Sequence, residues 1–284
     1  MELYVPSSEL VLSEPVMVLA LSGWVDSASI ATDAAEFIAD QGTEVGHFDA
    51  DRLFDYRSSR PILHFRGGDL EEIVWPRLRT FHTRVDDTDI LVVHGNEPDF
   101  LWRRLSEEFI EAARNYGVRL LVALGAVPAM VPHTRPSVEI LCTASDVSLL
   151  LEDDTVLQEE LIVPGAAVSI LSQAATEAGI DTVGYFARTP HYLNRPYHAG
   201  VLALLDRVSR QAGVHFDVAD LKAQAANQRE DLDRISAARP EIREYIERLE
   251  SAEQTSLGLS EDLPSADELA AEVERYLRQA SDDD

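Results

Sequence analysis

The chain has 284 residues, and 51 acidic against 24 basic side chains give it a formal net charge of -27 at pH 7. So negative a field repels phosphate backbones and anionic lipid surfaces, which argues against nucleic acid and membranes as partners. The chain has a single cysteine, so no disulfide can form within it. No apolar run approaches the ~20 residues of a membrane-spanning helix, and the N-terminus has no basic leader. We therefore predict a cytoplasmic protein.

The first half of the chain alternates apolar runs with amphipathic segments. Residues 16–21 form a continuous apolar run, which is typical of a strand covered on both faces. Residues 26–40 carry apolar side chains at helical spacing, and Gly42 is placed to end that helix. Further strands are predicted at residues 44–48, 62–65 and 90–93, and a helix from about Pro98 to Tyr116. The segment 74–85 gives no clear assignment.

The same alternation continues to about residue 216. Strands are predicted at residues 118–124, 138–142 and 181–186, a short acidic helix from Ser145, and longer helices at 164–179 and 195–212. Regular alternation of strands and helices favours a three-layer α/β/α sandwich with a mostly parallel sheet. We therefore assign residues 1–216 to one α/β/α domain.

Strand patterns and glycines almost vanish after Asp217, and acidic side chains predominate. Apolar residues recur at helical spacing, Pro240 interrupts the pattern, and residues 265–268 form a capping box before another apolar stripe. Residues 217–284 are thus predicted to be an acidic helical arm with a tail at 282–284. Its narrow apolar stripe has to pack on its own body or on a neighbouring subunit.

Two proline-bracketed loops, residues 131–136 and 187–196, follow buried strands. Each contains a Pro-His pair and an arginine, which places His133, Arg135, Arg188 and His191 at strand ends. In open α/β sheets ligands meet the carboxyl edge of the strands, so these side chains are candidates for binding an anionic group or the carboxylates of a partner. The alternative is that they satisfy loop carbonyls and anchor the loops.

Other strand ends carry further candidates. Trp24 can contact a ligand or pack in the body, and Asp26 can line a cleft or cap a helix. Glu97 can act as an acid or base, or complement a helix dipole. Arg66 follows the strand at 62–65. The glycine-led helix start at 165–169 can bind phosphate or simply pack closely.

Catalytic and metal-binding motifs are absent from the sequence. It contains no G-x-S-x-G nucleophile elbow, no H-E-x-x-H and no C-x-x-C. Its single thiol, Cys142, lies in an apolar run, where buried cysteines are usually inert. No cofactor and no metal are predicted.

Five motifs, taken in order, carry a resemblance to a known family. They are Ser-Gly-Trp-Val-Asp at residues 22–26, His-Phe-Arg-Gly at 64–67, His-Gly-Asn-Glu-Pro at 94–98, Pro-His-Thr-Arg-Pro at 132–136 and Pro-His-Tyr at 190–192. Together they resemble the proteasome assembly chaperone two family, and more narrowly its actinobacterial branch of unknown function. The resemblance covers about residues 1–250.

The resemblance implies a phosphorylase/hydrolase-like α/β/α fold, self-association with a trimer as one form, and a role in binding or assembling proteasome subunits. It supplies no catalytic residues. Some proteasome-binding members end in a hydrophobic-tyrosine-any tail, whereas this sequence ends in three aspartates.

Two functions therefore compete. The favoured one is a non-enzymatic, homo-oligomeric interaction protein whose loops and arm hold an assembling subunit. The rival is a small-molecule hydrolase or phosphorylase-like enzyme using the strand-end cleft. Its acid–base and anion-binding groups would be Asp26, Glu97, His133, Arg135 and His191.

Overall fold

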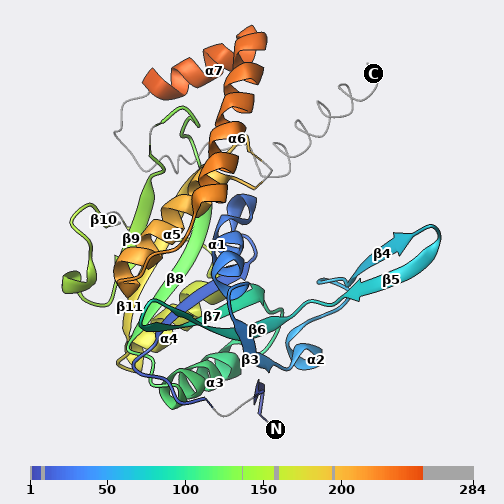
Figure 1. Ribbon diagram of the computed structural model, residues 1–284, viewed down its shortest axis with the longest axis vertical. Coiled ribbons are helices and arrows are strands. Elements are labelled where there is room, and N and C mark those ends of the chain that lie inside the picture. Colours follow the sequence, from blue (N-terminus) through green and yellow to red (C-terminus); the bar gives the residue numbers. More distant parts are fainter. Residues whose placement is uncertain (1, 8–9, 136, 157–159, 194–195, 252–284) are drawn as a thin grey trace.

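A nine-stranded mixed sheet forms the centre of the computed structural model, which describes residues 2–7, 10–135, 137–156, 160–193 and 196–251 (Figure 1). Its strands are β1 (Tyr4–Pro6), β2 (Val16–Ser22), β3 (Thr43–Phe48), β6 (Leu78–Val85), β7 (Thr88–Asn96), β8 (Leu120–Ala129), β9 (Ile140–Ala144), β10 (Thr155–Val156) and β11 (Asp181–Pro190). Their order across the sheet is β1-β3-β6-β7-β2-β8-β11-β9-β10. The predicted strands at 16–21, 44–48, 90–93, 118–124, 138–142 and 181–186 all belong to this sheet.

The sheet is not mostly parallel, and that prediction is wrong at the flanks. β7, β2, β8 and β11 run parallel, but β6 pairs antiparallel with both β7 and β3, and β9 pairs antiparallel with β11. For β6 and β7 the reason is their connection, because only Asp86 and Asp87 separate them. So short a link can join only antiparallel neighbours. The unassigned segment 74–85 contains β6, one of these flanking strands.

Helices cover both faces of the sheet. Val16, Val18 and Ala20 of β2 pack against one layer, formed by α1 (Ile30–Ala39) and α5 (His198–Ala212). Met17 and Leu19, the alternate residues, pack against the other layer, formed by α3 (Trp102–Asn115) and α4 (Ala167–Glu177). The continuous apolar run of β2 follows from this burial on both sides.

The start of α3 differs from the prediction, which placed it near Pro98. The backbone N–H of Glu97 donates to the Ser22 carbonyl at 2.9 Å, and those of Asp99 and Phe100 donate to Leu53 of α2 (Ala50–Leu53). Leu101 then adopts a left-handed φ of 61°. Because a left-handed residue cannot belong to a right-handed helix, α3 begins only at Trp102.

A separate two-stranded hairpin projects from the body (Figure 1). It consists of β4 (Ile62–Arg66) and β5 (Asp69–Val74), which pair only with each other. The predicted strand at 62–65 exists, but it lies outside the main sheet. Tyr56 and Trp75 meet at the root of the hairpin, with ring centroids 4.9 Å apart.

The C-terminal arm contains α6 (Ala219–Ala238) and α7 (Pro240–Ser251), separated at Pro240 as expected. Phe216, Val218 and Leu221 pack against the core on the α1 and α5 side, so the arm contacts its own body from its first turn. The boundary between residues 216 and 217 stays a prediction, and the features predicted at 265–268 and 282–284 lie outside the described residues. Within the described ranges, no helix is both long enough and apolar enough to cross a membrane.

His94 on β7 should make the fold sensitive to pH. Its side chain is buried, its Nε2 has no hydrogen-bond partner, and burial, with Arg79 and Arg77 nearby, lowers its pKa to about 4. Because this pKa lies below the usual 6.5, the unfolded chain binds a proton more readily than the folded one. The free energy of unfolding therefore keeps its full value above pH 6.5 and falls by about 3 kcal/mol as the pH drops towards 4. We expect His94→Leu to flatten this slope in chemical denaturation between pH 7 and 4. Parallel pH profiles for the two proteins would contradict this assignment.

Candidate functional site

The pairing of β8 with β11 brings the two proline loops together. The strands run parallel over ten residues each, with Leu120 opposite Asp181 and Ala129 opposite Pro190. The loops therefore leave the same edge of the sheet side by side, and the backbone N–H of His191 donates to the Ala129 carbonyl at 3.2 Å. The structure therefore places at one edge of the sheet the two loops that the sequence placed at strand ends.

His133 lies at the centre of this edge and is buried. Its backbone N–H donates to the Tyr192 hydroxyl at 2.7 Å, and its Nδ1 is 2.7 Å from the same oxygen. Its Nε2 lies 3.3 Å from Oδ1 of Asp233 on α6. Since the Asp233 carboxylate can only accept, Nε2–H donates to it, and Nδ1 of the neutral imidazole then accepts the proton of the Tyr192 hydroxyl. The three side chains form a chain of hydrogen bonds from tyrosine through neutral histidine to aspartate.

His191 forms a second polar link beside the first. Its Nδ1 lies 3.2 Å from the Ala129 carbonyl, which can only accept, so Nε2 is left to accept from the Tyr245 hydroxyl at 2.8 Å. Tyr192 stands between the two histidines, with ring centroids 5.9 Å from His133 and 5.5 Å from His191. The two histidines and two tyrosines therefore form one aromatic cluster, to which α7 contributes Tyr245.

The arm contacts this cluster through Asp233 of α6 and Tyr245 of α7, which the sequence did not predict. Figure 1 shows α6 and α7 at the same end of the molecule. Arg229 of α6 donates to the carbonyls of His133 at 2.7 Å and Thr134 at 3.1 Å, and it also pairs with Asp233 at 3.0 Å. Thr134 donates to Glu250 of α7. The acidic arm thus binds in cis to the loops that were expected to receive a partner's carboxylates.

The two arginines among the candidates for anion binding are already paired within the chain. Arg188 pairs with Glu139 at 2.5 Å, and Arg135 contacts the same carboxylate. Burial, followed by the charge of Arg229, lowers the pKa of His133, while Asp233 opposes that effect. Both arginines therefore serve one glutamate, and neither offers a free guanidinium to a ligand in this arrangement.

A groove of about 490 Å³ lies beside the first proline loop, residues 131–136, and between α5 and α6. Its lining includes His133, Arg135, Ile140, Leu202, Arg207 and Arg229. Apolar side chains form much of it, but its arginines are already paired, Arg207 with Asp153 at 2.8 Å and Arg229 with Asp233. Of the residues assigned to the rival enzyme, only His133 and Arg135 line this groove.

Asp26 and Glu97 serve helix starts. Oδ1 of Asp26 accepts from the Ala31 N–H at 2.8 Å and Oδ2 accepts from the Thr32 hydroxyl at 2.5 Å. Burial raises the pKa of Asp26, and these hydrogen bonds oppose the rise. Oε1 of Glu97 accepts from the N–H of Ala167 at 2.7 Å, so it caps α4 rather than complementing its own helix. That carboxylate also occupies a donor that a phosphate would need at the glycine-led helix start.

Trp24 and Arg66 lie outside the histidine cluster. Trp24 follows β2 and is half exposed, whereas Arg66 sits on the hairpin and pairs with Glu71 at 3.3 Å. The sequence prediction missed Tyr192, Tyr245, Arg229 and Asp233. Tyr192 was detectable as the last residue of the Pro-His-Tyr motif, but the arm residues carried no signal beyond i, i+4 spacing. The described residues contain no group of three or more His, Cys, Asp or Glu side chains placed to hold a metal ion.

Comparison with known proteins identifies the family. The sequence profile of the PAC2 family matches residues 20–236, most of the chain. The chain belongs to the PAC2 family. This confirms the resemblance drawn from the five motifs. A search of curated proteins finds no match.

Solved structures of PAC2-type proteins share the fold. A Mycobacterium tuberculosis protein of unknown function is 30% identical with a TM-score of 0.82, covering 88% of this chain and 87% of that one. A PAC2 family protein from Streptomyces avermitilis is 32% identical with a TM-score of 0.72, covering 82% and 99%. A Mycobacterium tuberculosis proteasome-assembly chaperone homologue is 30% identical with a TM-score of 0.74, covering 81% and 99%.

Arg229 should hold the arm on the loops. Arg229→Ala removes two charge-assisted hydrogen bonds to loop carbonyls, so we expect amide exchange in α6 and α7 to accelerate by about tenfold. The melting temperature should change little, because the core lies in the sheet and its helices. Arg234→Ala is the control, since Arg234 is exposed and pairs with Asp231 on the same helix. Equal exchange rates in the two variants would show that Arg229 does not hold the arm.

Proposed function

We propose that this PAC2 protein is a non-enzymatic, homo-oligomeric interaction protein that binds or assists the assembly of a protein complex. The observation that carries the proposal is the β4–β5 hairpin, whose apolar face stays exposed among the residues that the structure describes. The histidine cluster does not carry it, because the arm already occupies that edge.

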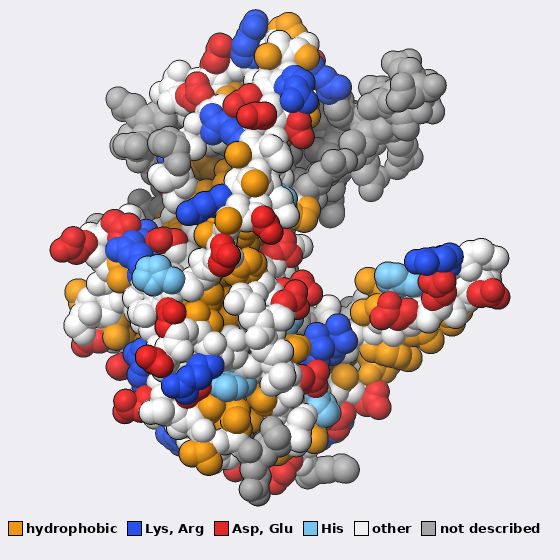
Figure 2. All heavy atoms as spheres, viewed as in Figure 1, with side chains coloured by type: hydrophobic (Ala, Val, Ile, Leu, Met, Phe, Trp, Pro, Cys, Tyr) orange, Lys and Arg blue, Asp and Glu red, His pale blue; other side chains and the backbone are white. Residues whose placement is uncertain are grey.

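The hairpin is amphipathic by its register. Leu63 pairs with Ile73 and Phe65 with Leu70. Leu63 and Phe65 are two residues apart, and a register shift that leaves Glu71 unpaired lets Leu70 and Ile73 share their face although they are three residues apart. The opposite face carries His64, paired with Glu72. Figure 2 shows hydrophobic side chains along one side of the hairpin and charged ones along the other. We call the four side chains Leu63, Phe65, Leu70 and Ile73 the hairpin face.

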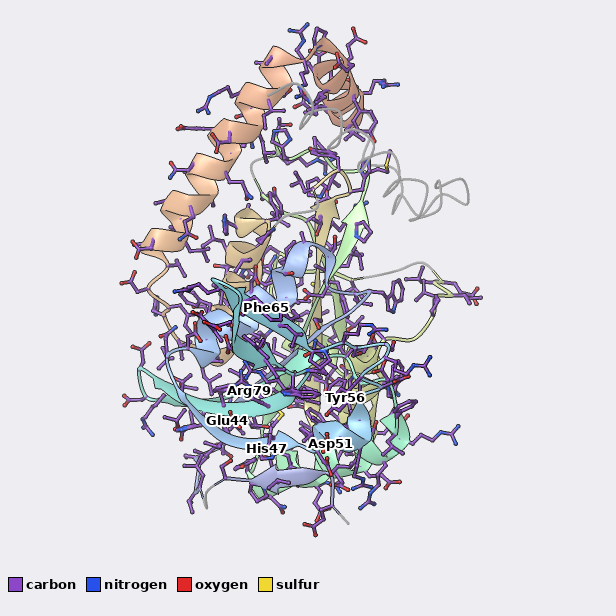
Figure 3. All side chains as sticks on the ribbon, turned by 90° about the vertical axis from the view of Figure 1, so that its right-hand side faces the viewer. Glu44, His47, Asp51, Tyr56, Phe65 and Arg79 are labelled. Carbon is purple, nitrogen blue, oxygen red and sulfur yellow. The ribbon has the colours of Figure 1, made fainter. Side chains whose placement is uncertain are left out.

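Exposure of the hairpin face to water is energetically unfavourable. Its four side chains are 41% to 63% exposed, and an isolated two-stranded hairpin is only marginally stable in water. Figure 3 looks at this side of the molecule and labels Phe65 on the hairpin and Tyr56 nearer the body. Contiguous exposed apolar surface of this kind marks protein–protein contacts. A second protein surface therefore completes the hairpin.

The family supports proteasome subunits as the class of partner. One relative at 30% identity is described as a proteasome-assembly chaperone homologue. We extend that role to this chain, with a trimer as the assembly that the family resemblance implies and the cytoplasm as its compartment. The helical layers on both faces of the sheet agree with a phosphorylase/hydrolase-like fold, which we keep as part of the proposal.

The rival enzyme finds less support. Asp26 caps α1, Glu97 caps α4, and His191 bonds to Tyr245, so the five residues assigned to catalysis serve separate structural contacts. Among the described residues, the Tyr192–His133–Asp233 chain of hydrogen bonds favours acid–base chemistry most, but its aspartate belongs to the arm that packs on the loops.

Self-association should depend on the hairpin face. We expect wild-type protein at micromolar concentration to sediment above the 31.5 kDa of one chain. Phe65→Gln should weaken this association by about tenfold or more, since a central aromatic side chain is lost. His64→Gln introduces the same side chain on the opposite face and should leave it intact. A wild-type protein that stays monomeric over a hundredfold concentration range would refute the oligomer.

The proposed partner class can be tested with purified components. We expect the protein to co-elute with separately purified proteasome subunits from the same organism in gel filtration and to change the rate at which they assemble. Bovine serum albumin at equal concentration is the control for non-specific effects. Neither co-elution nor a change in assembly rate would remove proteasome subunits as partners, while leaving self-association open to its own test.

A further inference from the structure

The long helix α6 packs loosely on the body. None of its 20 residues is buried, whereas α5 beside it buries Val201, Leu204, Leu205 and Val208. The groove of about 490 Å³ lies between these two helices, so they are not in close contact along their whole length. Segments with few buried apolar contacts open locally at a low cost in free energy. α6 can therefore leave the body without exposing a buried side chain of its own.

Three polar side chains of α6 bond to the body. Gln228 donates to the Pro196 carbonyl at 2.7 Å, ahead of α5. Arg229 donates to two carbonyls of the first proline loop, and Asp233 accepts from His133. Water can replace each of these hydrogen bonds when the helix moves away, so the net contribution of each to stability is modest. The attachment of α6 is therefore specific but reversible.

The first proline loop shows which groups a bound helix has to carry. The carbonyls of His133 and Thr134 accept two N–H groups, which the single guanidinium of Arg229 supplies. Nε2–H of His133 and the Thr134 hydroxyl donate, and the carboxylates of Asp233 and Glu250 accept. Because Arg229 and Asp233 are four residues apart, one face of a helix presents both. A guanidinium or a carboxylate alone would satisfy only part of the loop.

We propose that the proline loops, at residues 131–135 and 190–193, form a docking site for a helix of a partner protein that carries an arginine and, four residues later, an aspartate. The arm is the exchangeable occupant that keeps this site closed. This proposal rests on the proposed role as an interaction protein and adds to it a second surface and the chemistry of the partner. Arm and partner helix bond to the same groups, so docking of one requires release of the other.

A labelled peptide that copies residues 219–251 tests the exchange. In the full chain, Arg229→Ala combined with Asp233→Ala loosens the arm and leaves the loops unchanged. We expect fluorescence anisotropy to show that the peptide binds this loosened chain about tenfold or more tightly than the wild type, because the intact arm competes at a high effective concentration. The Arg234→Ala chain is the control and should match the wild type, since Arg234 pairs with Asp231 on α6 itself.

The peptide provides a second control. With Arg229→Ala and Asp233→Ala in the peptide, its affinity for the loosened chain should fall by about tenfold or more, because the charge-assisted hydrogen bonds are lost. Equal affinity of the two peptides would overturn the proposal, as would equal affinity of the peptide for the wild-type and loosened chains. Tyr245→Phe, which removes the bond of α7 to His191, loosens the arm independently and should also tighten peptide binding.

Self-association and co-elution with proteasome subunits are measured on the same preparations. If either of them is observed but the peptide does not bind the loosened chain, only the docking site is overturned. If the peptide binds the loosened chain while the wild type is monomeric and does not co-elute, the proposed function fails and the docking site stands.

Discussion

The register between β8 and β11 is the constraint on which the rest of this edge depends. Ten residues of each strand pair in parallel, and the last pair, Ala129 with Pro190, fixes where both loops begin. A slip of one residue would turn alternate side chains to the opposite face of the sheet. His133 would then lose its hydrogen bonds to Tyr192, and α6 and α7 would lose their hydrogen bonds to the loops. Both strands are buried on both faces, so such a slip would also disrupt their packing against the two helical layers.

A chain with so large an excess of carboxylates uses several of them to hold its own elements together. Asp26 and Glu97 satisfy the free N–H groups that begin α1 and α4, and Glu139 joins Arg135 of the first proline loop to Arg188 of β11. Asp233 completes the hydrogen bonds of a buried histidine. In each case the acid meets a donor that would otherwise be unsatisfied, which is where a carboxylate stabilises most. The same residue types that suggested binding chemistry at strand ends are the ones that helix starts require.

Much of the body was predictable because its strands are buried on both faces and read as apolar runs. β6 was not, because its alternation of buried and half-exposed residues, broken upstream by Trp75 and Pro76, resembles neither pattern clearly. The meeting of the two proline loops followed from the rule that parallel strands end at one edge. The packing of α6 and α7 on these loops could not be predicted, because the apolar stripe of the arm shows that it must pack on another surface but does not identify that surface. Tyr245 and Asp233 lie 54 and 100 residues from the histidines that they bond, and sequence spacing carries no information over such separations.

The cis contact of the arm sets a threshold for anything that approaches the loops. Asp233 is tethered through α6 to the body that it binds, so its effective concentration at His133 is of millimolar order, as for other short intramolecular connections. A free carboxylate in solution has to compete with Asp233 at this effective concentration. Only a partner that contacts several surfaces at once gains enough binding energy to displace the arm. A ligand that offers only a single carboxylate would therefore leave the arm in place on the loops.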